Sequence, residues 1–145
     1  MALRVGMIGT DGHVGMVLNG IPDTEGAALC ACAKGHPGDN VDRVGNSPAF
    51  TDRTAVYDDY GEMLEKEELD IVGVCRPYYL NAEAAIAAAE KHVHVICEKP
   101  VATAESDLDA LDDAVKRNGV RLTAMFGIRL YPAFQAARKA VAEGL

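Results

Sequence analysis

Short apolar runs alternate with helical patterns along the whole of this 145-residue sequence. Between the runs, apolar residues recur at helical spacing, which is the pattern of a helix with one buried face. Alternating strands and helices are typical of a parallel sheet that is covered by helices on both faces. The sequence therefore predicts an α/β fold: a doubly wound, mainly parallel sheet whose six strands lie at 3–8, 27–33, 56–57, 69–75, 93–97 and 121–126.

Besides an alanine-rich helix at 81–91, two helices are expected in the second half of the chain. Thr103 is predicted to cap the first, and Gly119 is predicted to end it. Pro132 suits the first turn of the second helix. The side chains expected on one face of these helices are Leu108, Leu111 and Val115 in the first, and Phe134, Ala137 and Val141 in the second.

Composition excludes several classes of function. The length fits one domain, and the net charge of −8 disfavours nucleic acid or an anionic membrane as a partner. No apolar run approaches the roughly 20 residues of a membrane span, and the opening residues do not form a signal peptide. Free thiols, a cytoplasmic location and no metal site are expected, because no C-x-x-C pair occurs among Cys30, Cys32, Cys75 and Cys97.

A glycine-rich turn follows the first strand. Gly9, Gly12 and Gly15 are spaced one residue more widely than in the usual G-x-G-x-x-G. Glycines between a strand and a helix let the backbone approach a pyrophosphate, and this context predicts a Rossmann-type dinucleotide site. Asp11 is expected either to point outward or to cap the following helix and compete with phosphate. The residues predicted to bind the cofactor here are Gly9, Thr10, Asp11, Gly12, His13 and Val14.

The end of the second strand bears on the choice of cofactor. An NAD site normally has an acid roughly 20 residues beyond the glycines, which accepts hydrogen bonds from the ribose. Here the strand runs into Lys34, Gly35 and His36 with no acid among them. Lys34, assisted by His36 or Arg43, is suited to a 2′-phosphate, so NADP is favoured over NAD. The alternative is that Lys34 is an ordinary solvated charge.

A second signal, Glu98-Lys99-Pro100, comes directly after the strand at 93–97. Ligands of open α/β sheets bind at the carboxyl ends of the strands. The glycine turn and Lys99 are therefore expected at one edge of one sheet. The alternative is that Glu98 and Lys99 are an ordinary exposed pair at the end of a strand.

Together these motifs resemble the N-terminal nucleotide-binding domain of the glucose-fructose oxidoreductase / inositol dehydrogenase / MocA (Gfo/Idh/MocA) family. The resemblance runs along essentially the whole chain, and 91–100 is its most specific part. The other matching segments are 9–15, 57–60, 69–77 and 129–134.

The resemblance implies roles for particular residues. Lys99 would be catalytic: it would hydrogen-bond the substrate hydroxyl and stabilise the alkoxide as hydride leaves. Glu98 would position the cofactor or Lys99. The loop after the fourth strand would contact the cofactor through Arg76, Pro77 and Tyr78. Asn81 stands where the family usually has a histidine, and Tyr78 and Tyr79 either stack on the nicotinamide or cover the sheet edge.

Family enzymes also have a second, antiparallel-sheet domain with most of the substrate pocket, and it is absent from residues 1–145. The resemblance thus implies the cofactor-binding domain of an NAD(P)-dependent oxidoreductase acting on a sugar, cyclitol or related polyol, inactive without that domain. Two alternatives stay open. One is a dinucleotide-binding or sensing module without catalysis. The other is a scaffold that has lost its ligand and self-associates through exposed apolar surface.

Overall fold

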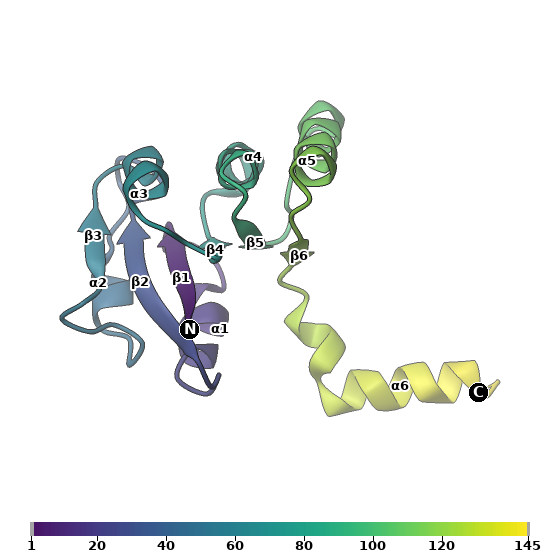
Figure 1. Cartoon of the computed structure of the whole chain (residues 1–145). Coiled ribbons are helices and arrows are strands. Elements are labelled where there is room, and N and C mark those ends of the chain that lie inside the picture. The colour runs from purple at the N-terminus through teal and green to yellow at the C-terminus, as the bar shows by residue number, and fades with distance from the viewer. Residues whose placement is uncertain (1, 145) are drawn as a thin grey trace.

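A computed structural model describes residues 2–144, which fold around one six-stranded sheet with the order β3-β2-β1-β4-β5-β6 (Figure 1). Every neighbouring pair of strands is parallel. The predicted α/β doubly wound sheet is therefore confirmed. The strands are β1 (Leu3–Ile8), β2 (Ala27–Ala33), β3 (Ala55–Tyr57), β4 (Ile71–Val74), β5 (His94–Cys97) and β6 (Leu122–Ala124).

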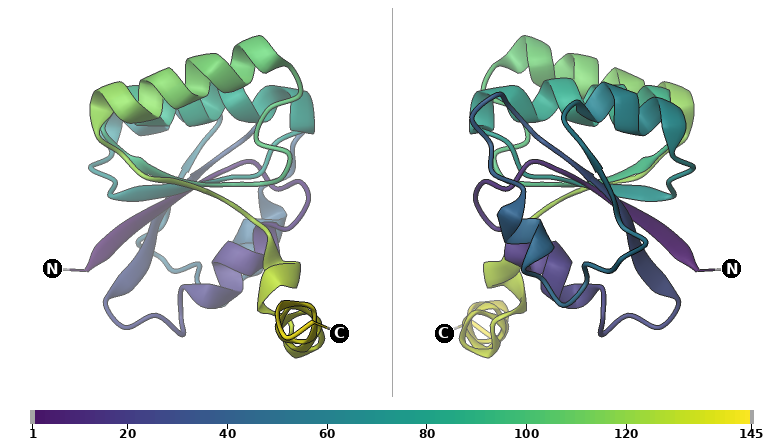
Figure 2. Two further views of the ribbon diagram at one scale, coloured as in Figure 1. Left: turned by 90° about the vertical axis from the view of Figure 1, so that its right-hand side faces the viewer. Right: turned by 90° about the vertical axis from the view of Figure 1, so that its left-hand side faces the viewer.

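Helices lie on both faces of the sheet (Figures 1 and 2). One face carries α3 (Tyr60–Lys66), α4 (Asn81–Glu90) and α5 (Glu105–Asn118), and the other carries α1 (Val14–Gly20) and α2 (Asp42–Gly45). Two short 3-10 helices, η1 (Tyr78–Leu80) and η2 (Gly127–Leu130), were not predicted. The last helix is α6 (Pro132–Ala142).

The core has two halves, one on each face of the sheet. Successive side chains of a strand point to opposite faces, and in β1 both Met7 and Ile8 are fully buried. Met7 packs in the cluster that contains Val17 and Leu18 of α1, and Ile8 packs in the cluster that contains Leu111 of α5. Burial on both faces explains why the central strands are continuous apolar runs rather than alternating patterns.

The start of α5 differs from its prediction. Its N-cap residue is Ala104, which makes no side-chain cap hydrogen bond, and Thr103 lies one residue before the cap. Leu111 is buried as predicted, but Leu108 is 49% exposed because it lies on the outer side of the helix. The end of the helix is as predicted: Gly119 adopts a left-handed conformation with φ of 66°.

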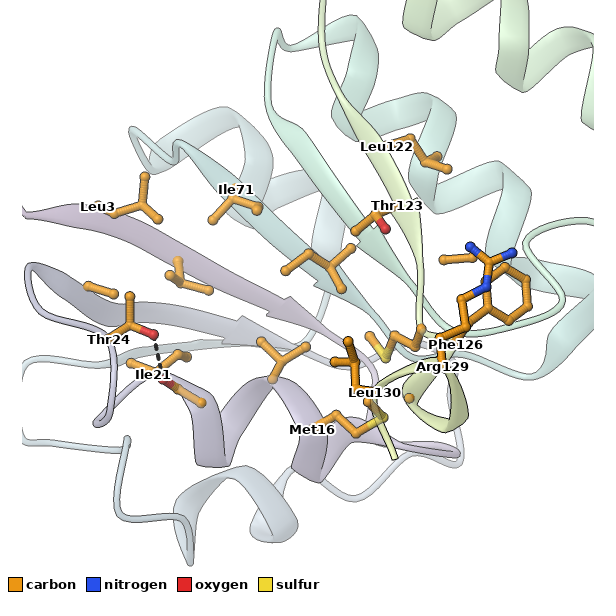
Figure 3. A pocket seen from close by; sticks show the side chains of 18 residues that line it. Leu3, Met16, Ile21, Thr24, Ile71, Leu122, Thr123, Phe126, Arg129 and Leu130 are labelled. Atoms are coloured by element: carbon orange, nitrogen blue, oxygen red, sulfur yellow. Dashed lines mark hydrogen bonds between the residues drawn. The ribbon is translucent and has the colours of Figure 1, made fainter. Parts of the chain in front are cut away.

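The sheet is incompletely covered on the face that carries α1. An apolar groove of about 630 Å³ lies between α1, the strands β1, β4, β5 and β6, and η2, and Figure 3 shows Met16, Ile71, Leu122 and Leu130 on its walls. Helix α6 projects away from the sheet, and none of its described side chains is buried. Both the apolar groove and the apolar side of α6 are therefore exposed in this chain.

Candidate functional site

The carboxyl ends of β1, β4 and β5 meet at one edge of the sheet, because the three strands are parallel neighbours. β1 runs into the glycine turn (Gly9–Gly15), and β4 runs into Cys75 and Arg76. β5 runs into the lysine turn (Glu98–Pro100), in which the Lys99–Pro100 peptide bond is cis. The structure thus brings the glycine turn and the lysine turn together.

Two positions of the glycine turn require glycine. Gly9 and Gly12 have φ of 81° and 56°, a region that side chains rarely adopt. A Cβ at Gly9 would collide with the carbonyl of Cys75, and a Cβ at Gly12 would lie 2.5 Å from Oε2 of Glu98. The turn is therefore a close-packed backbone cradle that a side chain would fill.

The backbone amides of this turn are partly occupied. Asp11 N donates to the Cys75 carbonyl at 2.9 Å, Thr10 N to Asp39 at 3.2 Å and His13 N to Glu98 at 2.5 Å. The amides of Gly12 and Val14 have no acceptor within residues 2–144. These two N–H groups are available to an anionic ligand such as a pyrophosphate.

Glu98 is fully buried and joins the two turns. Its carboxylate accepts hydrogen bonds from His13 N and from Lys99 N, the latter at 2.9 Å, and it lies 2.9 Å from His13 Nδ1. The Lys99 ammonium is 3.8 Å away. Burial, and secondarily the charge of Glu98, raises the pKa of the Cys97 thiol to about 12. The Glu98 carboxylate thus lies beneath the glycine turn and beside Lys99, the residue that the resemblance makes catalytic.

Lys99 reaches the surface next to a hollow. Its side chain is 40% exposed, and its ammonium lies 5.4 Å from the ring centroid of Tyr78. The hollow has a volume of about 350 Å³ and lies between the glycine turn and the loop after β4. The residues that line it are Asp11, Gly12, Arg76, Pro77, Tyr78 and Tyr79.

Arg76 and Asn81 are both buried and hold the loop after β4. The Arg76 guanidinium donates to the carbonyls of Gly35 and Leu80 and pairs with Glu83 at 3.0 Å. Asn81 Oδ1 accepts from Arg76 N, and its Nδ2 donates to the carbonyls of Glu98 and Pro100. These contacts hold the loop after β4 against the lysine turn. Both residues therefore help to fix one wall of the hollow.

The end of β2 holds an acid that the sequence interpretation missed. Asp39 is buried, and its carboxylate accepts from Thr10 Oγ1, Thr10 N and Gly35 N. A tight turn, closed by Asp39 N donating to the His36 carbonyl at 3.0 Å, brings it back to the strand end. The Pro-Gly pair within that turn was the signal in the sequence. Both carboxylate oxygens of Asp39 are engaged with protein donors.

Cations also gather at the end of β2. Lys34 Nζ lies 2.6 Å from Asp58, and this ammonium lowers the pKa of the Asp58 carboxyl. Arg43 donates to the Thr10 carbonyl. Three cationic or titratable side chains from the prediction, Lys34, His36 and Arg43, thus lie around the glycine turn and the β2 end.

The sequence suggested that Asp11 either points outward or caps α1, and its position in the structure matches neither suggestion completely. It does not cap α1, whose N-cap residue His13 makes no side-chain cap bond. One of its carboxylate oxygens is buried without a hydrogen bond, 3.4 Å from His36 Nε2. Asp11 therefore leans toward the loop after β2.

Within residues 2–144, no group of three or more His, Cys, Asp or Glu side chains is arranged to hold a metal ion. No helix in the same part of the chain is long and apolar enough to cross a bilayer. The cysteines are present as free thiols.

Comparison with known families and proteins gave consistent matches. The family described as "Oxidoreductase family, NAD-binding Rossmann fold" matches residues 3–126. Levoglucosan dehydrogenase from Pseudarthrobacter phenanthrenivorans is 37% identical over 86 residues, which are 59% of this chain and 22% of that enzyme. Inositol 2-dehydrogenase from Salmonella paratyphi B is 27% identical over 131 residues, which are 88% of this chain and 36% of that enzyme.

Solved structures extend the match to the whole fold. A Thermotoga maritima protein described as an oxidoreductase superposes with a TM-score of 0.86 at 33% identity, over 98% of this chain and 44% of that one. The scyllo-inositol dehydrogenase of Lactobacillus casei, solved with NAD(H) and scyllo-inositol, gives a TM-score of 0.82 at 16% identity, over 99% of this chain and 42% of that one. This chain therefore spans less than half the length of these relatives.

Proposed function

Because this chain belongs to the oxidoreductase family with an NAD-binding Rossmann fold, we propose that it is the cofactor-binding part of an NAD(P)-dependent oxidoreductase. Its substrate is a sugar, cyclitol or related polyol, and the reaction is hydride transfer. The observation that carries the proposal is the convergence of the two turns: free amides of Gly12 and Val14 lie at the same sheet edge as Lys99.

The glycine turn fits a pyrophosphate. It combines two unpartnered amides with positive-φ glycines whose Cβ atoms would fill the cradle. Tyr78 and Tyr79 are exposed beside the hollow and offer flat apolar surfaces to a ring. A bound nicotinamide would supply the hydride acceptor. The residues of this chain would hold it: the amides at the diphosphate, and the loop after β4 beside the ring.

Lys99 is the proposed catalytic residue. A cation fixed where negative charge develops stabilises an alkoxide as hydride leaves. Glu98 and Tyr78 hold the Lys99 ammonium from two sides, at 3.8 Å and 5.4 Å. Asn81 fixes the backbone around Lys99 through the carbonyls of Glu98 and Pro100. The ammonium is therefore positioned before a substrate arrives.

The relatives are longer, and we propose that turnover needs a second domain with the substrate pocket. This chain spans 36% of the Salmonella enzyme and 44% of the Thermotoga protein. We propose that this second domain also supplies the group that removes a proton from the substrate hydroxyl. The chain by itself is expected to bind cofactor without turning over a polyol.

The preferred cofactor is proposed to be NADP rather than NAD. The carboxylate of Asp39 is buried and already accepts three hydrogen bonds, which leaves it little capacity to accept from a ribose. Lys34 and Arg43 support this choice, because both are cations near the end of β2 and a cation suits a 2′-phosphate. The ion pair of Lys34 with Asp58 competes for the same ammonium, but Asp58 is 88% exposed and such surface pairs are weak.

A titration that follows nicotinamide fluorescence tests both dinucleotide binding and the preference for NADP over NAD. The sequence has no Trp whose fluorescence would interfere. NADPH is expected to bind about tenfold more tightly than NADH, a difference of roughly 1.4 kcal/mol, and Lys34→Ala should remove the difference. A tenfold preference for NADH would reverse the cofactor assignment.

The role of Lys99 is tested by turnover. With a second domain supplied in trans, Lys99→Ala should lower kcat about 100-fold or more. Unchanged turnover would favour a binding or sensing module instead.

The proposal also includes the oligomeric state of the chain and its location in the cell. The exposed apolar groove and α6 support association of two copies into a homo-oligomer. The four free cysteines support a reducing compartment such as the cytoplasm.

A further inference from the structure

We propose that dinucleotide binding at the glycine turn takes up a proton at His13, because Glu98 already holds a buried negative charge beneath that turn. His13 and Glu98, with the Lys99 amide and ammonium, form a unit that we call the clasp. The inference rests on the proposed function, since it requires a dinucleotide at the glycine turn. It adds a role for His13 that the motif itself does not contain.

The first step is the burial of Glu98. The side chain has no exposed surface, and the carboxylate is in contact with the backbone of the glycine turn. A carboxylate removed from water is costly unless hydrogen bonds and opposite charge compensate it. The hydrogen bonds come from His13 N and Lys99 N, and the nearby groups able to carry positive charge are the His13 imidazole and the Lys99 ammonium.

The second step is the geometry of the imidazole. His13 Nδ1 lies 2.9 Å and 3.1 Å from the two carboxylate oxygens of Glu98. An ionised carboxylate only accepts hydrogen bonds, so Nδ1 carries the hydrogen. Nε2 makes no hydrogen bond with the rest of the described chain, and the side chain is 52% exposed. A second proton can therefore enter at Nε2 from solvent without breaking the clasp.

The third step is the charge that a ligand would bring. A dinucleotide diphosphate carries two negative charges and would occupy the amides of Gly12 and Val14, on either side of His13. Repulsion between these charges and Glu98 grows as water leaves the site. Protonation of Nε2 places a positive charge between them. The bound state thus favours the imidazolium form of His13 more than the free state does.

Other titratable groups face the same turn. Asp11, within the turn, adds to the negative charge, and His36 from the loop after β2 lies 3.4 Å from it. Asp39 and Arg43 both contact Thr10, and Tyr78 lies beside Lys99. Only His36 is a second imidazole here among residues 2–144. It is therefore the rival source of any proton uptake, and the experiment has to separate it from His13.

Calorimetric titration of the whole chain with NADH tests the inference, in two buffers of different ionisation enthalpy and from pH 6 to 8.5. NADH is the suitable probe because a 2′-phosphate would itself titrate near pH 6. The chain is expected to take up protons on binding near neutral pH, so the heat of binding should differ between the two buffers. Affinity should fall with rising pH by up to about tenfold per pH unit.

Two variants should lower the proton uptake that accompanies NADH binding, one at Glu98 and one at His13. Glu98→Gln is close to isosteric, but its single amide oxygen can replace only one of the two carboxylate oxygens that accept from His13 N and Lys99 N, so NADH should bind more weakly and with less proton uptake. His13→Gln should bind NADH weakly and with the same Kd at every pH. The matched controls His36→Gln and His92→Asn, the latter at the exposed turn before β5, should both retain proton uptake.

The outcomes are distinct. Proton uptake that survives His13→Gln, or that disappears in His36→Gln alone, overturns the inference. A wild-type Kd that does not change with pH also overturns it, while the proposed dinucleotide site stands. Absence of NADH binding at every pH overturns both.

Discussion

Gly12 combines a positive φ with a contact to the buried carboxylate of Glu98. Gly12→Ala places a methyl group 2.5 Å from Glu98 Oε2 in a conformation that alanine avoids. We expect a loss of about 2 kcal/mol in the free energy of unfolding and a large loss of NAD(P)H affinity. Urea unfolding and fluorescence titration measure the two effects.

The control for this variant is Gly20→Ala, at the end of α1. A Cβ there meets nothing within 4 Å, and the position is helical. Alanine is favoured over glycine in a helix by up to about 1 kcal/mol. Equal effects of the two substitutions would show that Gly12 is tolerant and that the contact with Glu98 is unimportant.

The Cys97 thiol is expected to make the free energy of unfolding depend on pH. Its pKa is raised from 9.0 to about 12 by burial first and by Glu98 second. Between these values the unfolded chain loses the proton and the folded chain keeps it, so the free energy of unfolding falls as pH rises. At pH 10.5 this thiol accounts for a loss of about 2 kcal/mol relative to pH 8.

Urea unfolding at pH 8 and 10.5 checks the effect of Cys97. The cavity left by Cys97→Ala lowers stability at both pH values, but the decrease between them should be smaller than in wild type by about 2 kcal/mol. Cys30→Ala, at a half-buried position in β2, should leave the decrease unchanged. An identical decrease in wild type and Cys97→Ala would contradict the assignment.

Individual residues were predictable from sequence where their chemistry and their place on a strand coincide. Lys99 directly follows a buried strand, so its position at the sheet edge follows from the parallel topology. Asp39 was missed because a turn, and not a strand, returns it to the edge. The burial of Asn81 and Glu98 depends on contacts between segments that are distant in sequence, and local pattern does not contain them.

At the scale of the element, the start of α5 offers a clear test. Ala104 has an extended N-cap conformation without a side chain that can accept the hydrogen bond of a free amide. Ala104→Ser supplies that acceptor and should raise the free energy of unfolding by about 1 kcal/mol. Thr103→Ala should change it by less than about 0.5 kcal/mol. Urea midpoints of the two variants decide between residue 103 and residue 104 as the cap.

Elements were predictable where the apolar period is long and the ends carry specific residues. α3 begins after Asp59, whose side chain accepts from Glu62 N as expected for a helix cap. η1 and η2 were not predicted because a single turn has no period to detect. The sequence predicts Thr103 as the cap because a threonine side chain can accept the hydrogen bond of a free amide, but the backbone conformation, which the sequence does not show, places the cap at Ala104.

At the scale of the whole molecule, the exposed apolar groove and α6 are the main surfaces without a partner. α6 carries Phe134 and Val141, which are 51% and 73% exposed, and the groove lies against β1, β4, β5 and β6 (Figure 3). Parallel sheets are normally covered on both faces. Two copies that exchange these surfaces would bury both, and exposed patches of this kind promote association.

Light scattering across a range of concentrations tests this association. The apparent mass is expected to rise above the 15.4 kDa of one chain as concentration increases. Val141→Glu places a charge on the apolar side of α6, where no side chain is buried, so it should restore the monomer without unfolding the domain. Leu108→Glu, at an exposed site on α5, is the matched control and should associate as wild type does. A wild-type chain that stays monomeric at high concentration would mean that the groove and α6 do not pair between copies.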